Sequence, residues 1–289
     1  MILLVGATGR LGGNVARRLL AEGHAVRVLV HPDSDYDALE RAGCEPILGD
    51  IKYPESFGPA FYEIETVIST ASATEPEDWL DSYQRLDLNG NRNLIDAARA
   101  AGVGQFIFLS ELGADPEHPV PYFCAKGRIE AHLRLSGMPY TILAAAPLIE
   151  VWVERLIFRP LRAGYPASVI GEGTRRHSLL SEVDLVAFTT AVIGHPAAQN
   201  QTLAVGGPEV VSWLDVVVRL EEVIGHEIPV QHYRPGALLP ELSPDISQIA
   251  ANFEAFDYAL DMDELARTFG VALTPLDVTL SRVAGSLVI

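Results

Sequence analysis

Hydrophobic residues in the first half of the chain form short continuous runs, and longer amphipathic segments separate these runs. The predicted strands are Ile2–Val5, Ala25–Val30, Glu45–Leu48, Thr66–Ser69, Gln105–Leu109 and Tyr140–Leu143. The predicted helices lie near Leu11–Glu22, Tyr36–Ala42, Pro54–Phe61, Trp79–Ala101 and Phe123–Ser136. Continuous apolar strands that alternate with helices are typical of a parallel sheet covered on both faces. The pattern therefore predicts an α/β fold with a Rossmann-type doubly wound parallel sheet.

The pattern changes after Pro147, where helices and short extended pieces follow one another less regularly. Helices are predicted near Leu148–Arg162, Glu182–Ile193, Ser212–Ile224 and Ile246–Tyr258, and extended pieces at Ser168–Ile170, Thr202–Val205 and Ile228–His232. We expect residues 1–147 to form the Rossmann domain. Residues 148–289 are expected to form a smaller C-terminal subdomain that binds the substrate as a lid over the carboxyl edge of the sheet.

Composition narrows the range of possible partners. Hydrophobic residues make up 48% of the 289 residues, which is typical of a globular protein, and the formal net charge is −17. Such an acidic chain is not expected to bind nucleic acid or an anionic membrane surface, because both need clustered basic residues. The two cysteines and the lack of a secretory signal predict a cytoplasmic protein. The eight histidines show no metal-ligand spacing, so no metal is expected.

Three glycines spaced three residues apart follow the first predicted strand, in the stretch GATGRLG. Gly6, Gly9 and Gly12 lie where the strand would end and a helix would begin. A dinucleotide pyrophosphate needs backbone N–H groups at a helix N-terminus and glycines that permit a close approach. We therefore expect a dinucleotide site formed by these glycines with Thr8, Arg10 and Leu11. The alternative is a tight turn that only packs the helix against the sheet.

The ends of the next three strands are expected to complete this site. His31 follows the second strand, where a basic residue favours NADP and an acidic one favours NAD, but Asp33 lies two residues later. Arg10 could reach the same phosphate, so NADP is slightly preferred and NAD stays open. Asp50 and Ile51 follow the third strand; Asp50 could accept from the adenine amino group or could cap a turn. Thr70 and Ala71, after the fourth strand, are expected to line the cofactor and substrate space.

A tyrosine and a lysine four residues apart carry the candidate chemistry. On a helix, Tyr122 and Lys126 would lie one turn apart on the same face. A phenol has a pKa near 10, and a neighbouring ammonium would lower that pKa and make it a better acid–base catalyst. Ser110, at the end of the fifth strand, could hold a substrate oxygen beside Tyr122. The alternative is an exposed tyrosine with a solvated lysine neighbour.

Taken together, GATGRLG, the GD after the third strand, NLIDAARAAGV, FIFLS, Tyr122-x-x-x-Lys126 and SGMPYTIL resemble the NmrA-like branch of the atypical short-chain dehydrogenases/reductases. The resemblance implies an NAD(P)H-binding domain and carbonyl reduction by Ser110, Tyr122 and Lys126, with the lysine also holding the cofactor ribose. Two departures stand out. Ala144–Ala146 precede Pro147 where many relatives have arginine, and Asp87 stands where many have an asparagine of a proton relay.

The resemblance leads to two hypotheses about function. The first is an NAD(P)H-dependent oxidoreductase that reduces a carbonyl, quinone or enone of a small, largely apolar molecule. The second, from the same mixed branch, is a non-catalytic redox sensor or complex-assembly factor, which would act as a homodimer or with a protein partner. Leu148 and Trp152 are expected to line the substrate space, with Phe158, Phe253, Phe256 and Tyr258 as further candidates. His177 is expected at the surface or in a loop.

Overall fold

The computed structural model describes residues 1–73 and 82–285, and the chain divides into two compact units. The first unit contains Met1–Ala144 and Val186–Leu203, and the second contains Ala145–Leu185 and Ala204–Ile289. The chain therefore returns to the first unit after residue 185. The single boundary after residue 147 was predicted from a change in pattern, which carries no information about such a return.

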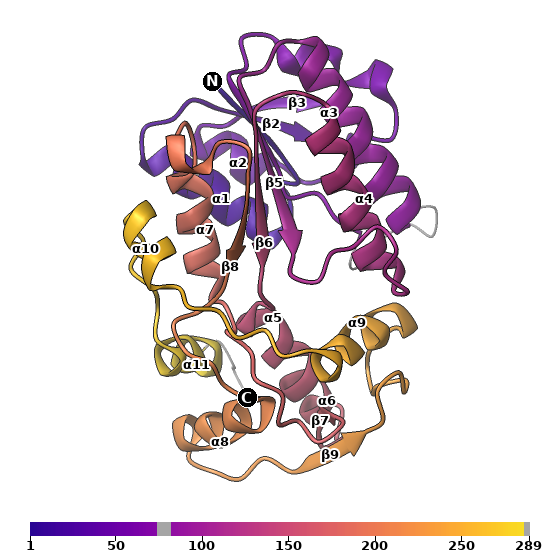
Figure 1. Cartoon of the computed structure of the whole chain (residues 1–289), viewed down its shortest axis with the longest axis vertical. Helices are drawn as coiled ribbons and strands as arrows, with labels where there is room; N and C mark the ends of the chain where they lie inside the picture. The colour runs from indigo at the N-terminus through magenta and orange to yellow at the C-terminus, as the bar shows by residue number, and fades with distance from the viewer. Residues whose placement is uncertain (74–81, 286–289) are drawn as a thin grey trace. The chain divides into compact units, whose positions relative to one another are not determined.

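A seven-stranded sheet forms the framework of the first unit (Figure 1). Its strand order is β3-β2-β1-β4-β5-β6-β8. The strands are β1 (Ile2–Val5), β2 (Val26–Val30), β3 (Glu45–Leu48), β4 (Thr66–Ser69), β5 (Gln105–Glu111), β6 (Tyr140–Ala145) and β8 (Gln201–Val205). β1 pairs in parallel with β2 and β4, β2 with β3, and β4 with β5. The predicted Rossmann-type α/β fold is confirmed.

The burial of the strands explains why each of them appears in the sequence as a continuous run of apolar residues. All four residues of β1 are buried, as are those of β4, because helices cover both faces of the central strands. β3 lies at the edge and is less buried, with Leu48 51% exposed. β1 and β4 are neighbours in the sheet. Strands β2 and β3 extend to one side of this pair and the later strands to the other, so the strand order reverses between β1 and β4. Ligands of open α/β sheets bind at the carboxyl ends of such strands.

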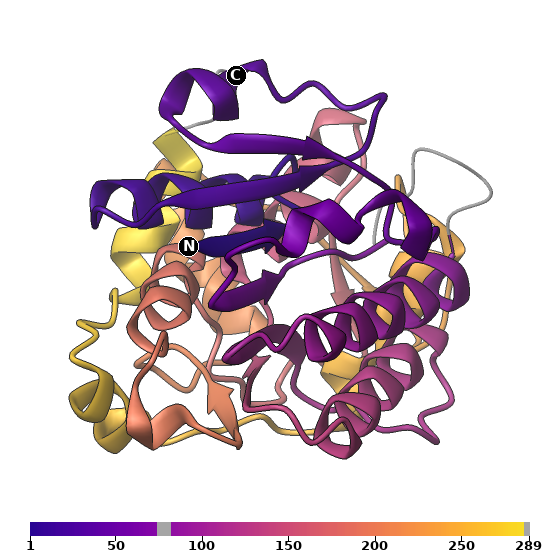
Figure 2. The same cartoon turned by 90° about the horizontal axis from the view of Figure 1, so that it is seen from above.

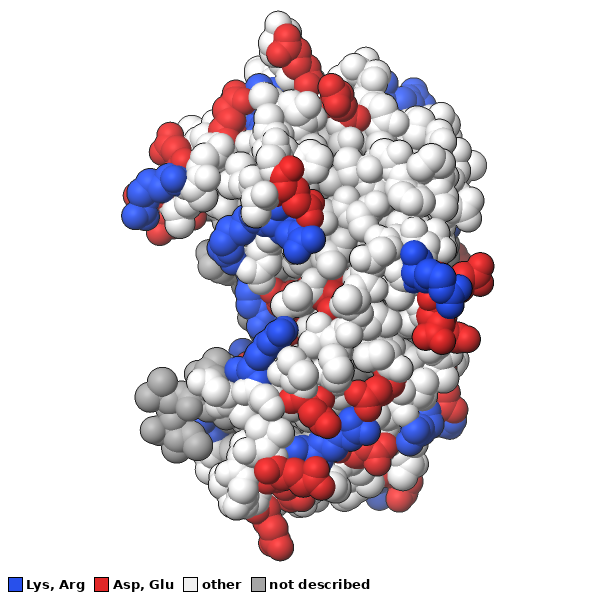
Figure 3. All heavy atoms as spheres, turned by 90° about the vertical axis from the view of Figure 1, so that its left-hand side faces the viewer, with Lys and Arg blue, Asp and Glu red and all other residues white. Residues whose placement is uncertain are grey.

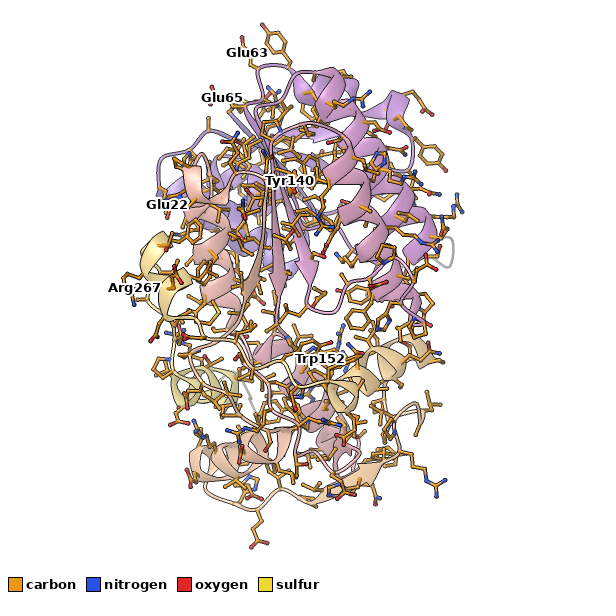
Figure 4. The ribbon with its side chains drawn as sticks, in the orientation of Figure 1. Glu22, Glu63, Glu65, Tyr140, Trp152 and Arg267 are labelled. Atoms are coloured by element: carbon orange, nitrogen blue, oxygen red, sulfur yellow. The ribbon has the colours of Figure 1, made fainter. Side chains whose placement is uncertain are left out.

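Helices lie on both faces of this sheet. Figure 1 shows α3 (Asn91–Ala100) and α4 (Pro121–Leu135) on one face and α1 (Arg10–Ala21) and α2 (Asp37–Ala42) on the other, and Figure 2 shows α3 and α4 side by side. The later residues of α7 (Glu182–Ala191) also belong to this unit. Thr190 on α7 donates a hydrogen bond to Glu22, which follows α1 (Figure 4).

The segment before α3 differs from the single helix predicted for Trp79–Ala101. Residues 79–81 lie outside the described residues, Tyr83–Gly90 is a π-helix (η3), and α3 begins at Asn91. The Asn91 side-chain amide donates to the Asp87 carbonyl at the junction. π-Helical turns are frequent at functional sites, and this one carries Asp87. The predicted Pro54–Phe61 helix is instead two 3₁₀-helices, Pro54–Ser56 and Gly58–Phe61.

The second unit contains short helices and a two-stranded parallel sheet. β7 (Ala167–Ile170) pairs with β9 (Val230–Tyr233). The remaining elements are α5 (Ile149–Val153), the π-helix η4 (Glu154–Phe158), α6 (Arg159–Arg162), α8 (Trp213–Ile224), α9 (Pro244–Ala255), α10 (Asp263–Phe269) and α11 (Leu276–Gly285). Neither α10 nor α11 was predicted, because both are short and follow a chain segment without clear helical period.

Candidate functional site

The three glycines of the first loop form a tight turn between β1 and α1. Gly6 has a φ of +85°, and a Cβ there would lie 2.6 Å from Thr70 Oγ1. A Cβ on Gly12 would lie 2.1 Å from the Gly6 carbonyl oxygen, so the helix can approach the strand only because residue 12 has no side chain. Both glycines are therefore explained by backbone geometry and packing.

Gly9 has a different reason to be glycine. Its φ is −75°, and a Cβ would come no closer than 3.4 Å to the Gly6 carbonyl oxygen, so neither strain nor packing requires glycine here. Gly9 is the exposed N-cap of α1 and has no side-chain cap hydrogen bond. Its neighbours Thr8 and Arg10 are exposed too. An open helix N-terminus with room above it fits the pyrophosphate of a dinucleotide, which the alternative of a packing turn does not explain.

The residues predicted for the adenosine end lie close together after β2 and β3. His31 Nε2 is 3.5 Å from Asp50 Oδ2, and His31 Nδ1 is 3.7 Å from Asp33 Oδ2. Asp50 Oδ1 accepts the Lys52 N–H at 2.8 Å, which is the turn-capping role kept open for this residue. The Lys52 ammonium lies 3.6 Å from Asp50 Oδ2 and adds a cationic group that the sequence analysis did not single out.

The other predicted cofactor residues divide into loop and core positions. Thr70 Oγ1 donates to the Val5 carbonyl at 3.0 Å, and the backbone of Ala71 lies against Gly6, so both border the glycine turn. Leu11 is half-buried in the first turn of α1. Ile51 is buried, and its side chain fills the space in which a Cβ on Gly90 would lie. Ile51 therefore packs against η3 while its backbone continues the loop after β3.

The Tyr122 side chain is buried on the first turn of α4, which begins with Pro121. Its hydroxyl donates to Glu111 Oε1 at 2.8 Å. The Tyr83 ring of η3 packs edge-on against the Tyr122 ring, with centroids 5.5 Å apart. The alternative of an exposed tyrosine is wrong, because Tyr122 is only 5% exposed.

The electrostatic surroundings of Tyr122 oppose its ionisation. Burial raises the pKa of Tyr122 well above its usual value near 10, and the Glu111 carboxylate raises it further by its charge and hydrogen bond. Asp87 and Tyr83 add to the rise in this pKa. The pKa of Tyr122 is therefore shifted upward, opposite to the direction predicted from the presence of Lys126. The phenol therefore stays protonated at neutral pH and keeps a proton to donate.

Lys126 is buried one helical turn after Tyr122, as predicted, but its charge is directed to Asp87. Its Nζ lies 4.0 Å from Asp87 Oδ1 and donates to the Leu109 carbonyl at 3.2 Å. Asp87 accepts hydrogen bonds from Ser72 Oγ and the Ala73 N–H, both at 2.8 Å. Burial raises the pKa of Asp87, and the Lys126 ammonium and these donors partly offset the rise. Asp87 thus holds Lys126 in place.

Ser110 makes a different contact from the one predicted for it. Its hydroxyl donates to Glu130 Oε1 at 2.6 Å, and Arg134 donates to Glu130 Oε2 at 2.7 Å. Arg134 also donates to Thr202 of β8 at the surface, so this chain of polar groups ties β5 and β8 to α4. The contact with the Tyr122 hydroxyl belongs to the next residue, Glu111. The interpretation of Ser110 as the group beside Tyr122 is corrected accordingly.

The residues predicted for the substrate belong to the second unit. Trp152, on α5 (Figure 4), is 7% exposed and meets the Phe253 ring edge-on at 4.8 Å. Leu148 is half-buried and forms a bridge with Leu180. His177 lies in the loop between β7 and α7, which is one of its two predicted positions. It is only 1% exposed, and its ring centroid lies 5.5 Å from that of Phe253, so the other prediction, a surface position, is wrong. In the structure, Trp152 and His177 are core residues of this unit.

Comparison with known proteins identifies the family. A family model described as NAD(P)H-binding matches residues 6–154. The chain is 31% identical over 231 residues to the photosystem II assembly factor Ycf39 of Trieres chinensis, covering 79% of this chain and 70% of that protein. The chain belongs to the NAD(P)H-binding family. This confirms the predicted resemblance to the NmrA-like atypical short-chain dehydrogenases/reductases and the predicted cofactor class, NAD(P).

Solved structures share the fold of this NAD(P)H-binding chain across its length. An NADPH-dependent quinone oxidoreductase from Escherichia coli, complexed with NADPH, has a TM-score of 0.80 at 23% identity and covers 98% of this chain and 100% of that chain. A triphenylmethane reductase from Citrobacter sp., complexed with NADP(H), has a TM-score of 0.80 at 22% identity with the same coverage. At these identities the likeness concerns the fold.

The sequence of this NAD(P)H-binding chain contained no signal that marked Glu111. A glutamate at a strand end is common, and only the path of the loop between β5 and α4 brings it to Tyr122. Lys52 could have been noticed, because it is one of two lysines in the chain.

In residues 1–73 and 82–285, no helix is long and apolar enough to cross a membrane. The same described residues contain no group of three or more His, Cys, Asp or Glu placed to hold a metal.

Proposed function

We propose that this chain is an NAD(P)H-dependent oxidoreductase that reduces a small organic molecule by hydride transfer. The observation that carries the proposal is the buried pair of Tyr122 and Lys126, one helical turn apart beside the carboxyl end of β5. The glycine turn after β1 and the loops after β2 and β3 would hold the dinucleotide at this same edge of the sheet. A bound reduced nicotinamide supplies the hydride.

The proposed role of Tyr122 is to donate a proton to the reduced oxygen of a carbonyl-type substrate. A raised pKa keeps the phenol protonated, and an alkoxide is a strong enough base to take its proton. The reverse reaction needs a phenolate, which burial and Glu111 oppose.

Lys126 and Asp87 support Tyr122 in this proposal. Lys126 is held by Asp87 and by the Leu109 carbonyl, in a position from which its ammonium could also reach the ribose hydroxyls of the cofactor. Ser72 donates to Asp87 and is itself half-buried. We assign Asp87 and Ser72 the role of holding the Lys126 ammonium in place, which leaves Ser110 and Glu130 a structural role.

The test is the Tyr122→Phe variant in a screen of quinones, enones and ketones. Loss of the proton donor should lower turnover by about 10²–10⁴-fold for carbonyl substrates, while NADPH affinity stays within about twofold. Turnover is measured from the loss of reduced-nicotinamide absorbance, and affinity by fluorescence titration. Tyr140→Phe is the control, because Tyr140 begins β6 away from this site (Figure 4). Carbonyl reduction that survives Tyr122→Phe contradicts the assigned proton donor.

A second candidate function is supported by the identity to the photosystem II assembly factor. In this case the chain would bind NAD(P) and a protein partner without turning over a substrate, as a redox sensor or assembly factor. Tight NADPH binding with no oxidation across the substrate screen would favour it. The buried Tyr122–Lys126 pair favours the enzyme, because a sensor needs no proton donor.

A further inference from the structure

His31 and Asp33 give the adenosine end of the site two opposite signals, because a basic residue after β2 favours NADP(H) and an acidic one favours NAD(H). We propose that His31 switches this preference with pH, so that protonated His31 favours NADP(H) and neutral His31 favours NAD(H). The inference goes beyond the proposed function, because it concerns the binding of the cofactor and holds whether or not a substrate is reduced.

The hydrogen bonds around His31 describe its neutral form. The Asp33 backbone N–H donates to His31 Nδ1 at 3.3 Å, so this nitrogen carries a lone pair and no proton. The ring proton is then on Nε2, which lies 3.5 Å from Asp50 Oδ2. In this form the ring donates no proton to the Asp33 carboxylate, and the Asp33 side chain is 91% exposed. This carboxylate can therefore accept from the ribose hydroxyls of NAD(H).

Protonation changes the partner of His31 Nδ1. Asp33 Oδ2 lies 3.7 Å from this nitrogen, so a ring with a proton there gains the carboxylate and gives up the backbone N–H. The same charge attracts Asp50 Oδ2 on the Nε2 side of the ring. Protonated His31 therefore neutralises a carboxylate that repels a 2′-phosphate and adds a positive charge beside it.

The charged groups around His31 are balanced closely enough for one proton to matter. Asp33 on the same loop and Asp50 after β3 face the ring, and the Lys52 ammonium lies 3.6 Å from Asp50 Oδ2. With neutral His31, these two carboxylates outweigh the ammonium and disfavour a phosphate, whereas one proton on His31 balances the signs. The His31 side chain is 44% exposed and exchanges protons with solvent, and imidazole groups change charge between about pH 5 and pH 8.

The experiment compares NADP⁺ with NAD⁺, which differ only at the 2′ position and are stable in mild acid. Isothermal titration calorimetry on the full chain gives Kd for both nucleotides at about pH 6 and about pH 8, at constant ionic strength. The measured quantity is the selectivity ratio, which is Kd for NAD⁺ divided by Kd for NADP⁺. His31→Gln cannot be charged, and Asp33→Asn removes the carboxylate. His24→Gln changes an exposed histidine near the other end of β2 and is the matched control.

We expect the selectivity ratio of the wild type to rise by about three- to tenfold from about pH 8 to about pH 6, the scale of one added charge beside the phosphate. The 2′-phosphate loses part of its own charge over this range, which opposes the expected rise and cannot imitate it. His24→Gln should keep the rise and His31→Gln should lose it. Asp33→Asn should have a higher ratio than the wild type already at about pH 8.

A wild-type ratio that does not rise in acid, or one that rises equally in His31→Gln, overturns the proposal. An Asp33→Asn ratio equal to that of the wild type at about pH 8 also overturns it, because Asp33 then does not act on the 2′ position. A ratio that depends on His31 and pH, without oxidation of NADPH by any substrate of the screen, supports this inference and contradicts the proposed oxidoreductase instead.

Discussion

At the residue scale, the end of β5 shows how one position along a strand changes the chemistry. Successive strand residues point to opposite sides, so Ser110 and Glu111 cannot face the same group. Ser110 bonds to Glu130 and Glu111 bonds to Tyr122. The pair Tyr122 and Lys126 could be predicted, because helical spacing alone puts them on one face. Their partners could not, because these come from β5 and η3, and no local pattern connects them.

The phosphate end of the site leads to a prediction about Arg10. Arg10 is exposed on the first turn of α1, on the loop proposed to hold the dinucleotide. If it contacts the 2′-phosphate, Arg10→Ala should weaken NADPH binding by about tenfold, the scale of one charge-assisted contact, and leave NADH binding within about twofold. Fluorescence titration with both nucleotides measures this difference. Arg99→Ala, an exposed charge removed from α3, controls for net charge. Equal losses for NADPH and NADH would show that Arg10 does not read the 2′-phosphate.

At the scale of elements, periodicity predicted β1, β3 and β4 to the residue and the other strands of the first half to within two residues. The errors lie where contacts from other elements decide the backbone. η3 is π-helical where its side chains bond to Ser72 and pack on Tyr122, and a period read from the sequence cannot detect one extra residue in a turn. The glycine turn, in contrast, could be predicted from the sequence, because the spacing of its glycines indicates where the backbone of the helix packs closely against the strand.

This packing gives a prediction for Gly12. Gly12→Ala would place a Cβ against the Gly6 carbonyl. This carbonyl belongs to the backbone and cannot rotate away as a side chain could, so the turn must shift. We expect a loss of about 1–3 kcal/mol in the free energy of unfolding and a loss of NADPH affinity of at least about tenfold. Chemical denaturation and fluorescence titration measure the two effects.

Gly58→Ala is the control for this variant, because nothing lies within 4 Å of the Cβ it would add. Its free energy of unfolding should match that of the wild type or rise slightly. A Gly12→Ala protein with wild-type NADPH affinity would show that the turn does not hold the cofactor.

At the scale of the whole molecule, each of the two units has its own core. In the second unit, Trp152, His177 and Trp213 surround Phe253. These aromatic residues are far apart in the sequence; Trp152 and Phe253 were predicted to line the substrate space, and His177 to lie at the surface or in a loop. The whole chain has a net charge of −17. On the face drawn in Figure 3, acidic and basic side chains nevertheless lie next to one another in several places.

The buried His177 predicts how stability depends on pH. Burial lowers the pKa of His177 from its usual value near 6.5, while Asp257 opposes and Arg175 adds to this shift by their charges. The unfolded chain therefore binds the proton first, and stability falls as the pH drops below about 6.5. The raised pKa values of Glu150 and Asp184 act in the opposite direction, so the test must isolate His177.

Comparing variants isolates this contribution. His177→Gln should show a shallower loss of unfolding free energy than the wild type between about pH 7 and pH 5, whatever its absolute stability. His24→Gln, which changes an exposed histidine, should keep the wild-type slope. Urea denaturation at several pH values measures the slopes, and identical slopes for His177→Gln and wild type would refute the assignment.

The sequence by itself determined the Rossmann sheet, the glycine turn at its first strand and the Tyr122–Lys126 pair. These features are local: strand burial, helix period and close backbone packing are written in the spacing of neighbouring residues. Only the tertiary structure decided that Glu111 faces the phenol, that Asp87 takes the charge of Lys126, and that His177 is buried. Each depends on elements distant in the chain, whose side chains meet because the sheet and its helices bring them together.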